Sequence, residues 1–425
     1  MKRRFVIPGL FLLFITSFFL SFAVAFKVIV MGLLVFFVLA DSSFKQKLVL
    51  FKERTHAWFM LAFAFALLIS FFLSDNHSAG IRFLQLRLPL ILFPLSIGLM
   101  QMTKELRDKI LLGCAAIVSV SCLASLVFAI FKYWQKNDAA WIYNDALSYL
   151  IGQQSIYTSL LVNISIYIFS YHLLYSLFSK GYKVILTIGI IFLFIISYLL
   201  ASRNMMLLLY IITICFSMFF LLKKRKYLQG ATILISMLIV GFLVFRFFPK
   251  TINRFKELAF TQFTFQSQAK ESHYADTLSP DQWNGANFRL AAWQCGWQLF
   301  KEHPLTGVGL GDKKDELFKV YEQKRFHFAI ATGKNVHNNY LDILYSLGVA
   351  GFLLFIAGWI LLPLIRVIRN HDGLAFIILI TFTFAMLTEN YFDRSIGAML
   401  FCFFVNFLLS YNNKRTVATK NVSCE

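Results

Sequence analysis

The sequence predicts an all-α polytopic membrane protein, a bundle of about twelve transmembrane helices with one large, partly helical loop outside the cytoplasm. Three observations predict this class. Hydrophobic residues make up 59% of the 425 residues and charged residues only 15%, unlike a soluble domain. Apolar runs long enough to cross a bilayer recur along most of the chain. Nearly all dense polar sequence falls in one stretch, from about residue 248 to 339.

The first apolar stretch, residues 5–40, follows a basic N-terminus. Only Lys27 interrupts it and no clear small-residue cleavage site appears, so we expect an uncleaved pair of spans rather than a signal peptide. Ten further runs have the length of a membrane span. They lie near residues 57–73, 81–99, 110–132, 155–178, 183–201, 204–222, 229–248, 340–366, 373–389 and 394–411.

Lys and Arg are distributed unevenly between the two sides that these spans define. With a cytoplasmic N-terminus, the inner segments hold 21 of them, and the short outer segments with their helix ends hold seven. This positive-inside bias places the polar stretch outside the cytoplasm. We therefore expect nine spans over residues 1–248, an outer loop with catalytic residues over 249–339, three spans over 340–411 and a cytoplasmic tail over 412–425.

The net charge of +20 does not indicate a nucleic-acid-binding protein, because no soluble segment carries a basic stripe interleaved with aromatic residues. Lys and Arg between apolar runs are typical of topology signals and lipid-headgroup contacts. Six cysteines are scattered singly, without a CxxC or Cys/His pairing, so the sequence indicates neither a zinc site nor a disulfide framework.

Three arginines lie at predicted outer ends of spans, where a charge is costly unless it binds an anion or extends to headgroups. Arg82 and Arg87 flank the start of the run 81–99, and for them both possibilities stay open. Arg203 lies in the tight turn ASRN at residues 201–204. No carboxylate is near it in the sequence, so we expect its charge to be available for a ligand.

The polar stretch contains a predicted helix over residues 287–300. Arg289, Trp293, Trp297 and Phe300 share one stripe of this helix. The helix could simply lie in the membrane interface. That interpretation does not explain Arg289, which lies at the apolar edge of the helix. The planar guanidinium of an arginine in this position could bind a phosphate through two hydrogen bonds.

The segment HPLTGVGLG at residues 303–311 has glycines at alternate positions. Such glycines could form a backbone nest for an anion. The segment lacks the lysine of a P-loop, so a structural turn is the better interpretation of the glycines.

His337 closes the polar stretch and is the best candidate for proton transfer, because imidazole titrates near neutrality. A lone histidine is more often structural. The chain has no HExxH, DxD or GxSxG motif, so neither metal nor serine hydrolysis is indicated. In the link between the last two spans, we expect Glu389 or Asp393 to hold Arg394 in a structural pair.

Five features occur in an order that resembles the O-antigen ligase and polymerase superfamily. They are ASRN at 201–204, Arg289 with Trp293, HPLTGVGLG at 303–311, HNNYL at 337–341 and LGVAG at 347–351. The resemblance implies a GT-C-like, inverting glycosyltransferase that needs neither a metal nor a cofactor. Such enzymes take a glycan from undecaprenyl pyrophosphate at the periplasmic face of the bacterial inner membrane.

The resemblance also implies roles for single residues. Arg203 and Arg289 match the arginines that stabilise the pyrophosphate leaving group, and His337 matches the base that takes the acceptor's proton. QQSIY at residues 153–157 keeps the tyrosine of relatives but lacks their histidine. The predicted substrate-binding residues are Arg82, Arg87, Tyr157, Trp293, His303, Asn338 and Asn339.

The acceptor distinguishes the members of this superfamily. It is a sugar of the lipid A core in the ligases, another lipid-linked repeat in the polymerases and a protein side chain in related oligosaccharyltransferases. We favour a ligase, whose partners would be the lipid-linked donor, the glycan acceptor and membrane lipids. A polysaccharide or lipid transporter is the alternative from another class, but the sequence lacks the repeat symmetry expected of one. A structural assembly protein is a further alternative.

Overall fold

The chain folds into helices within the part that the computed structural model describes, which is residues 3–20, 24–222, 225, 227–247, 253, 255–272 and 281–411. No strand forms in these residues, where one isolated bridge joins Met102 to Tyr411. The predicted tail at 412–425, and all of the basic run 223–226 except Arg225, lie outside them. The predicted all-α class is confirmed.

The chain divides into two compact units. Unit 1 consists of Met1–Ile117, Gly296–Phe318 and Val336–Glu425, and unit 2 consists of Val118–Cys295 and Lys319–Asn335. Three helices contribute residues to both units. They are α7 (Lys104–Lys136), α14 (Asn287–Glu302) and α15 (Lys313–Gln323).

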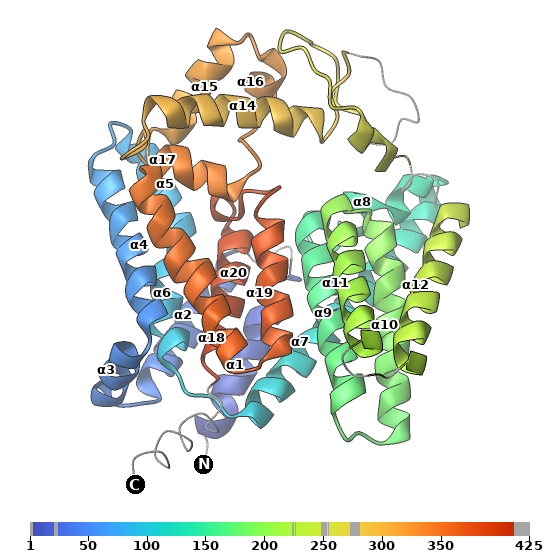
Figure 1. Cartoon of the computed structure of the whole chain (residues 1–425). Helices are drawn as coiled ribbons and strands as arrows, with labels where there is room; N and C mark the ends of the chain where they lie inside the picture. Colours follow the sequence, from blue (N-terminus) through green and yellow to red (C-terminus); the bar gives the residue numbers. More distant parts are fainter. Residues whose placement is uncertain are drawn as a thin grey trace. The chain divides into compact units, whose positions relative to one another are not determined.

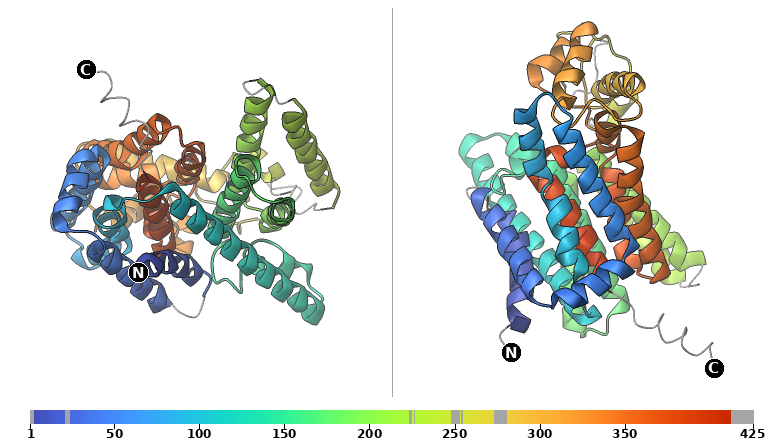
Figure 2. Two further views of the ribbon diagram at one scale, coloured as in Figure 1. Left: turned by 90° about the horizontal axis from the view of Figure 1, so that it is seen from below. Right: turned by 90° about the vertical axis from the view of Figure 1, so that its left-hand side faces the viewer.

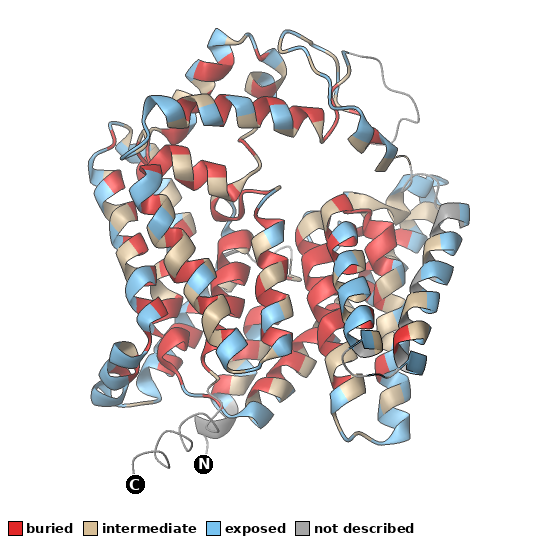
Figure 3. Cartoon of the chain, viewed as in Figure 1, coloured by how far each residue is buried: buried red, intermediate tan, exposed pale blue. Residues whose placement is uncertain are grey.

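Unit 1 is a helical bundle in which α20 is buried along nearly its whole length (Figure 3). A helix that is apolar on every side belongs in the middle of a bundle. α4 packs against α6, α17 and the π-helical segment η4. α4 and α17 lie side by side in the views of Figure 1 and Figure 2. The elements of this unit outside the shared helices are α1 (Arg3–Ser17), α2 (Val24–Ala40), α3 (Phe44–Glu53), α4 (Thr55–Phe72), α5 (His77–Arg87), α6 (Pro89–Leu95), η1 (Ile97–Leu99), α17 (Asn339–Phe355), η4 (Ile356–Leu361), α18 (Leu362–Arg369), α19 (Gly373–Ala385), η5 (Tyr391–Asp393) and α20 (Ser395–Leu409).

Unit 2 is built around α9, which packs against α10 and α11 while α11 packs against α12 (Figure 1). Within the 18-residue apolar window of α9, 78% of the residues are buried. Its elements outside the shared helices are η2 (Ala139–Ile142), α8 (Asn144–Leu147), α9 (Ser155–Tyr175), α10 (Lys180–Leu200), α11 (Arg203–Leu222), α12 (Tyr227–Phe247), η3 (Glu257–Ala259) and α16 (His327–Thr332).

Several helices begin at residues whose side chains cap the first turn. Ser43 forms a capping box with Gln46 at the start of α3. Ser179 accepts from a backbone N–H of α10, and Asp372 does the same for α19. These residues are the ordinary sequence signals of a helix start, so the helix boundaries follow from local sequence.

The chain is a multi-pass membrane protein by the length and apolar character of its helices. Six helical stretches among the described residues are long and apolar enough to span a bilayer, or seven if the bent pair Ala25–Ala40 and Phe44–Glu53 is one span. Within the described residues, each predicted apolar run falls mainly on helix. Ile185, Ile188 and Ile191 of α10 are more than half exposed, as lipid-facing residues are. The total of twelve spans stays a prediction.

Two predicted spans are less regular than expected. The run 81–99 divides into α5, α6 and η1, because Pro89 begins a new helix and Pro94 lies within it. The run 340–366 bends at Gly348, which has a φ of 66° and a ψ of −172°. Such a conformation is essentially restricted to glycine.

Gly348 also allows the segment 303–311 to cross α17 in close contact. A Cβ atom there would overlap the Leu305 carbonyl, and the Val349 N–H donates to the Pro304 carbonyl at 2.9 Å. We expect Gly348→Ala to lower the free energy of unfolding by about 3 kcal/mol or more, from backbone strain together with the clash. Thermal unfolding of purified protein tests this. Gly373→Ala is the control, since nothing lies within 4 Å of a Cβ at that position. Equal stability of both variants would contradict the packing described here.

Candidate active site

The turn between α10 and α11 places Arg203 at a helix start in unit 2. α10 ends at Leu200, Ala201 is left-handed with a φ of 48°, and α11 begins at Arg203. A helix N-terminus carries partial positive charge, so the guanidinium adds to a potential that already favours anions. The turn predicted at 201–204 is confirmed.

The expectation that no carboxylate balances Arg203 is wrong. Arg203 Nη1 lies 3.4 Å from Glu257 Oε2, and the two side chains are 8% and 0% exposed. The Ser272 hydroxyl donates to the other oxygen of Glu257 at 3.1 Å. Glu257 follows Arg203 by 54 residues, so local sequence could not reveal the pair. A buried partner of this kind fixes the position of the guanidinium.

Arg289 and Arg203 meet at the backbone of Gly285. A Cβ atom at Gly285 would overlap Arg203 Nη2 and lie 3.0 Å from Arg289 Nη1. Arg289 Nη1 also donates to the Gly285 carbonyl at 2.5 Å. Unit 2 therefore brings together the two arginines that the sequence analysis assigned to one pyrophosphate. Only a residue without a side chain leaves room for both.

Two asparagines hold the backbone on either side of Gly285. Asn284 Oδ1 accepts from the N–H groups of Ala286 and Asn287, and Asn287 Oδ1 accepts from the Asn284 N–H at 2.8 Å. They form the start of α14 and confirm the helix predicted over 287–300. Neither asparagine was singled out from the sequence, although Asn before a helix is a known capping signal.

His337 lies in unit 1, just before the first turn of α17. Its Nδ1 is 3.0 Å from Glu389 Oε2, and the two side chains are 24% and 9% exposed. When Nδ1–H donates to the carboxylate, Nε2 carries the lone pair that a base needs. His337 has a φ of 47°, a left-handed conformation that costs a non-glycine residue about 1–3 kcal/mol and concentrates at functional sites.

Glu389 and Asp393 do not hold Arg394, contrary to expectation. Glu389 pairs with His337, and Asp393 pairs with Arg87 and Lys313. Arg394 is exposed and forms no ion pair with any residue that the structure describes. Asp393 instead neutralises two less exposed cations, for which the loss of hydration would otherwise be uncompensated.

Comparison with known families agrees with the sequence resemblance. Residues 188–356 match the family model described as O-Antigen ligase. The chain carries a domain of the O-antigen ligase superfamily. A search among curated proteins found no match. The matched range contains Arg203, Arg289 and His337, whereas Glu389 lies beyond it. The family assigns a function of the O-antigen ligase or polymerase type, with lipid-linked glycans as the general class of substrate.

Two asparagines support the backbone beside His337. Asn338 caps α17 by accepting from the N–H groups of Tyr340 and Leu341, each at 3.0 Å. Asn339 is fully buried and accepts from the Phe392 N–H at 3.1 Å. We therefore propose that both hold His337 in place, rather than binding substrate as the sequence suggested.

Arg87 belongs to a buried network of four charges. Its Nη2 lies 3.0 Å from Asp342 and 3.4 Å from Asp393, and Lys313 Nζ reaches the same carboxylates at 2.8 and 2.6 Å. Nε and Nη1 of Arg87 donate to no residue that the structure describes. Two cations and two anions balance, so we interpret Arg87 as part of the framework that joins α5, α15, α17 and η5.

The contribution of this charge network to the stability of the fold should not change in mild acid. Burial raises the pKa of Asp393, but the charges of Lys313 and Arg87 outweigh it and lower the pKa to about 2. A depressed pKa contributes stability above the unfolded value near 3.9, and this stability is lost as the pH falls toward 2. We expect Asp393→Asn to lower the unfolding temperature equally from pH 8 to pH 5. Melting curves of both proteins across this range test the prediction. It would be contradicted if the difference in unfolding temperature between wild type and variant vanished by pH 6.

The glycine segment 303–311 is a packing element, as the better of the two interpretations predicted. Val308 and Gly309 donate their N–H groups to carbonyls of α17, at 2.9 and 3.0 Å. Leu310 and Gly311 donate theirs to the hydroxyls of Ser70 and Ser74, both at 2.9 Å. These amides are already bonded, so they do not form an anion-binding nest.

The remaining predicted substrate-binding residues lie in different surroundings. Arg82 and His303 are exposed, and Arg82 forms no ion pair with any described residue. Trp293 is half-buried on α14, and Tyr157 is buried on α9. No three His, Cys, Asp or Glu side chains gather as a metal-binding group in the part of the chain that the structure describes. Contacts between these four residues and substrate stay proposals.

Proposed function

We propose that this protein is an O-antigen ligase that transfers a glycan from undecaprenyl pyrophosphate to a sugar hydroxyl of the lipid A core. The family match supports transfer of a lipid-linked glycan in general. The contact between His337 Nδ1 and Glu389 Oε2 is the observation that supports a catalytic mechanism for this transfer. A histidine oriented by a carboxylate has the arrangement of a general base.

The reaction is a single displacement at the anomeric carbon. The acceptor oxygen forms a bond to this carbon while the bond to the pyrophosphate oxygen breaks. His337 Nε2 accepts the hydroxyl proton, and Glu389 stabilises the imidazolium that forms. Attack from the face opposite the leaving group inverts the anomeric configuration.

Arg203 and Arg289 stabilise the pyrophosphate as it leaves. Negative charge grows on the phosphate oxygens as the glycosidic bond breaks, and guanidinium groups held in place stabilise it without reorganisation. Glu257 and the Gly285 backbone hold them. In this proposal the two arginines supply the positive charge that a metal ion supplies in other transferases.

The positive-inside distribution supports a periplasmic location for this chemistry. The loop 249–339 follows the ninth predicted span, and the inner segments carry three times as many Lys and Arg as the short outer segments with their helix ends. We propose a multi-pass protein of the bacterial inner membrane, with the catalytic residues facing the periplasm, where the lipid-linked glycan and the lipid A core meet.

Deletion of the gene in its source organism, followed by lipopolysaccharide profiling, tests the assignment of the acceptor. A ligase deletion removes the whole high-molecular-weight ladder and leaves free lipid-linked glycan to accumulate. Bands with a single repeat would indicate a polymerase instead. An unchanged ladder would contradict the ligase and direct the search to a protein or another glycan acceptor.

Glu389 should act as a positioning residue for His337. We expect Glu389→Gln to lower kcat by about 10-fold or more, but by less than the ~10²–10⁴-fold that a general base contributes. The KM for the lipid-linked donor should stay unchanged. Glu389→Asp, which keeps the charge, should recover part of the rate. Steady-state kinetics of purified variants measure this.

The matched control is Glu302→Gln, which removes an exposed carboxylate from the end of α14. It should leave kcat and KM unchanged. If Glu389→Gln instead raised KM at constant kcat, or if Glu389→Asp were no better than Glu389→Gln, Glu389 would not orient the base.

A further inference from the structure

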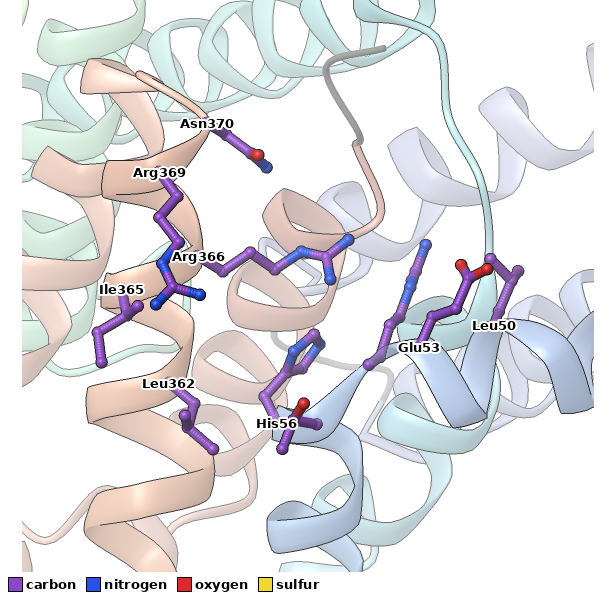
Figure 4. A pocket seen from close by; sticks show the side chains of 10 residues that line it. Leu50, Glu53, His56, Leu362, Ile365, Arg366, Arg369 and Asn370 are labelled. Carbon is purple, nitrogen blue, oxygen red and sulfur yellow. The ribbon is translucent and has the colours of Figure 1, made fainter. Parts of the chain in front are cut away.

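A pocket of about 270 Å³ lies in unit 1 where α3 meets α4 and where α18 ends (Figure 4). α17, η4 and α18 follow one another in the chain, and His337 directly precedes the first of them. The pocket lies at the opposite end of this helical stretch. The helical stretch Asn339–Arg369 bends at Gly348, and the 21 residues that follow the bend are roughly 32 Å long, close to the thickness of the hydrocarbon core of a bilayer. The pocket thus lies at headgroup depth in the opposite leaflet.

Positive charge dominates this pocket. Arg54, Arg366 and Arg369 line it, and Glu53 is the carboxylate among its lining residues. Arg54 is 1% exposed and donates to the carbonyls of Gly98 and Met100, not to a carboxylate. No ion pair joins Glu53 to these arginines among the residues that the structure describes. Three clustered guanidinium groups without carboxylate partners attract an anion.

Two buried nitrogen atoms of the pocket make no hydrogen bond with any described residue. They are Nε2 of His56, whose side chain is 3% exposed, and Nε of Arg366. Leaving a buried donor unsatisfied costs about 1–3 kcal/mol. Figure 4 shows the His56 ring and the Arg366 guanidinium directed into the space between α18 and the start of α4. Phosphate oxygens in this space would accept from the terminal nitrogens of the Arg366 guanidinium.

The size and surroundings of the pocket favour a lipid headgroup over a glycan. A volume of 270 Å³ is just below the range of small-molecule sites, enough for a phosphate with a glycerol but not for an oligosaccharide repeat. Leu50, Leu362 and Ile365 give the pocket apolar walls. Leu361 at the end of η4 and Ile368 on α18 are 52% and 56% exposed, as residues beside acyl chains are.

We propose that this pocket binds the phosphate of an anionic phospholipid from the leaflet opposite His337. The basic pockets between transmembrane helices that hold acidic headgroups have the same chemistry. Arg366 and Arg369 contact the phosphate. The site is separate from the proposed transfer reaction.

Native mass spectrometry of the purified protein in detergent tests this site. The added ligands are phosphatidylglycerol, phosphatidylcholine and glycerol 1-phosphate. We expect wild type to retain phosphatidylglycerol and the double variant Arg366→Gln/Arg369→Gln to bind it at least tenfold more weakly. The control is Lys45→Gln/Lys109→Gln, which removes the same charge from exposed positions of unit 1 and should bind like wild type.

The other outcomes are equally informative. Displacement of phosphatidylglycerol by glycerol 1-phosphate at similar concentration would keep the phosphate site but assign it to a soluble ligand. Equal binding by the double variant and wild type, or equal retention of phosphatidylcholine, would overturn the proposal. If the double variant unfolds, Arg369→Glu replaces it, because that side chain is exposed and its reversal should weaken binding without a cost in folding.

Discussion

We expect His337→Asn to lower the turnover of glycan transfer by about 10²–10⁴-fold while donor binding changes little, because the variant removes the proposed base and leaves the arginines intact. Asparagine is the appropriate replacement. His337 has a φ of 47°, and Asn tolerates the left-handed region better than most residues. Alanine would add backbone strain to the chemical loss. Single-turnover rates with purified protein measure the effect.

His371 provides a matched control. It is an exposed histidine of unit 1, with a φ of 53°, and it follows α18 at the other end of the unit. His371→Asn makes the same chemical change in the same backbone conformation, so its turnover should equal that of wild type. If His337→Asn kept more than a tenth of the wild-type rate, His337 would not be the base.

The second large effect is expected for Arg203→Lys, which should lower kcat by about 10²–10³-fold, the loss typical of one preorganised donor at a developing charge. Lysine keeps a positive charge near the buried Glu257 but cannot reproduce the planar fork. Arg203→Ala would also leave Glu257 buried without this partner, at a cost of about 3–5 kcal/mol in stability, so its kinetics would be harder to interpret.

Arg325→Lys is the control for this prediction, because Arg325 is an exposed arginine of the same unit. Gly285→Ala provides an independent test, since its Cβ would displace the Arg203 guanidinium without removing any charge. Both Arg203→Lys and Gly285→Ala should lose turnover while remaining folded. Normal rates in both would contradict a role for Arg203 in stabilising the leaving group.

The sequence predicted those features of the fold that depend on neighbouring residues. Apolar runs of span length predicted the helices, and the short link at 201–204 predicted the turn that presents Arg203. The spacing of Arg289 and Trp293 predicted α14. Composition alone was sufficient for the all-α membrane class.

Pairs between distant residues could not be predicted in this way. Glu257 lies 54 residues after Arg203, and Glu389 lies 52 residues after His337. Nothing in the local pattern distinguishes these acids from others in the same loops. Arg87 seemed available for substrate because Asp342 and Asp393 come from other elements. The bend at Gly348 was missed because a single glycine in an apolar run does not indicate which backbone crosses there.

We propose that this chain transfers a lipid-linked glycan by means of its own side chains, without a metal ion. The most direct test is conversion of a radiolabelled undecaprenyl-pyrophosphate glycan by purified protein, with lipid A core as acceptor and EDTA present. The proposed mechanism predicts labelled product in which the anomeric configuration of the transferred sugar is inverted, and none with His337→Asn. A folded wild-type protein that forms no product, or forms it only after a divalent metal is restored, would contradict the claim.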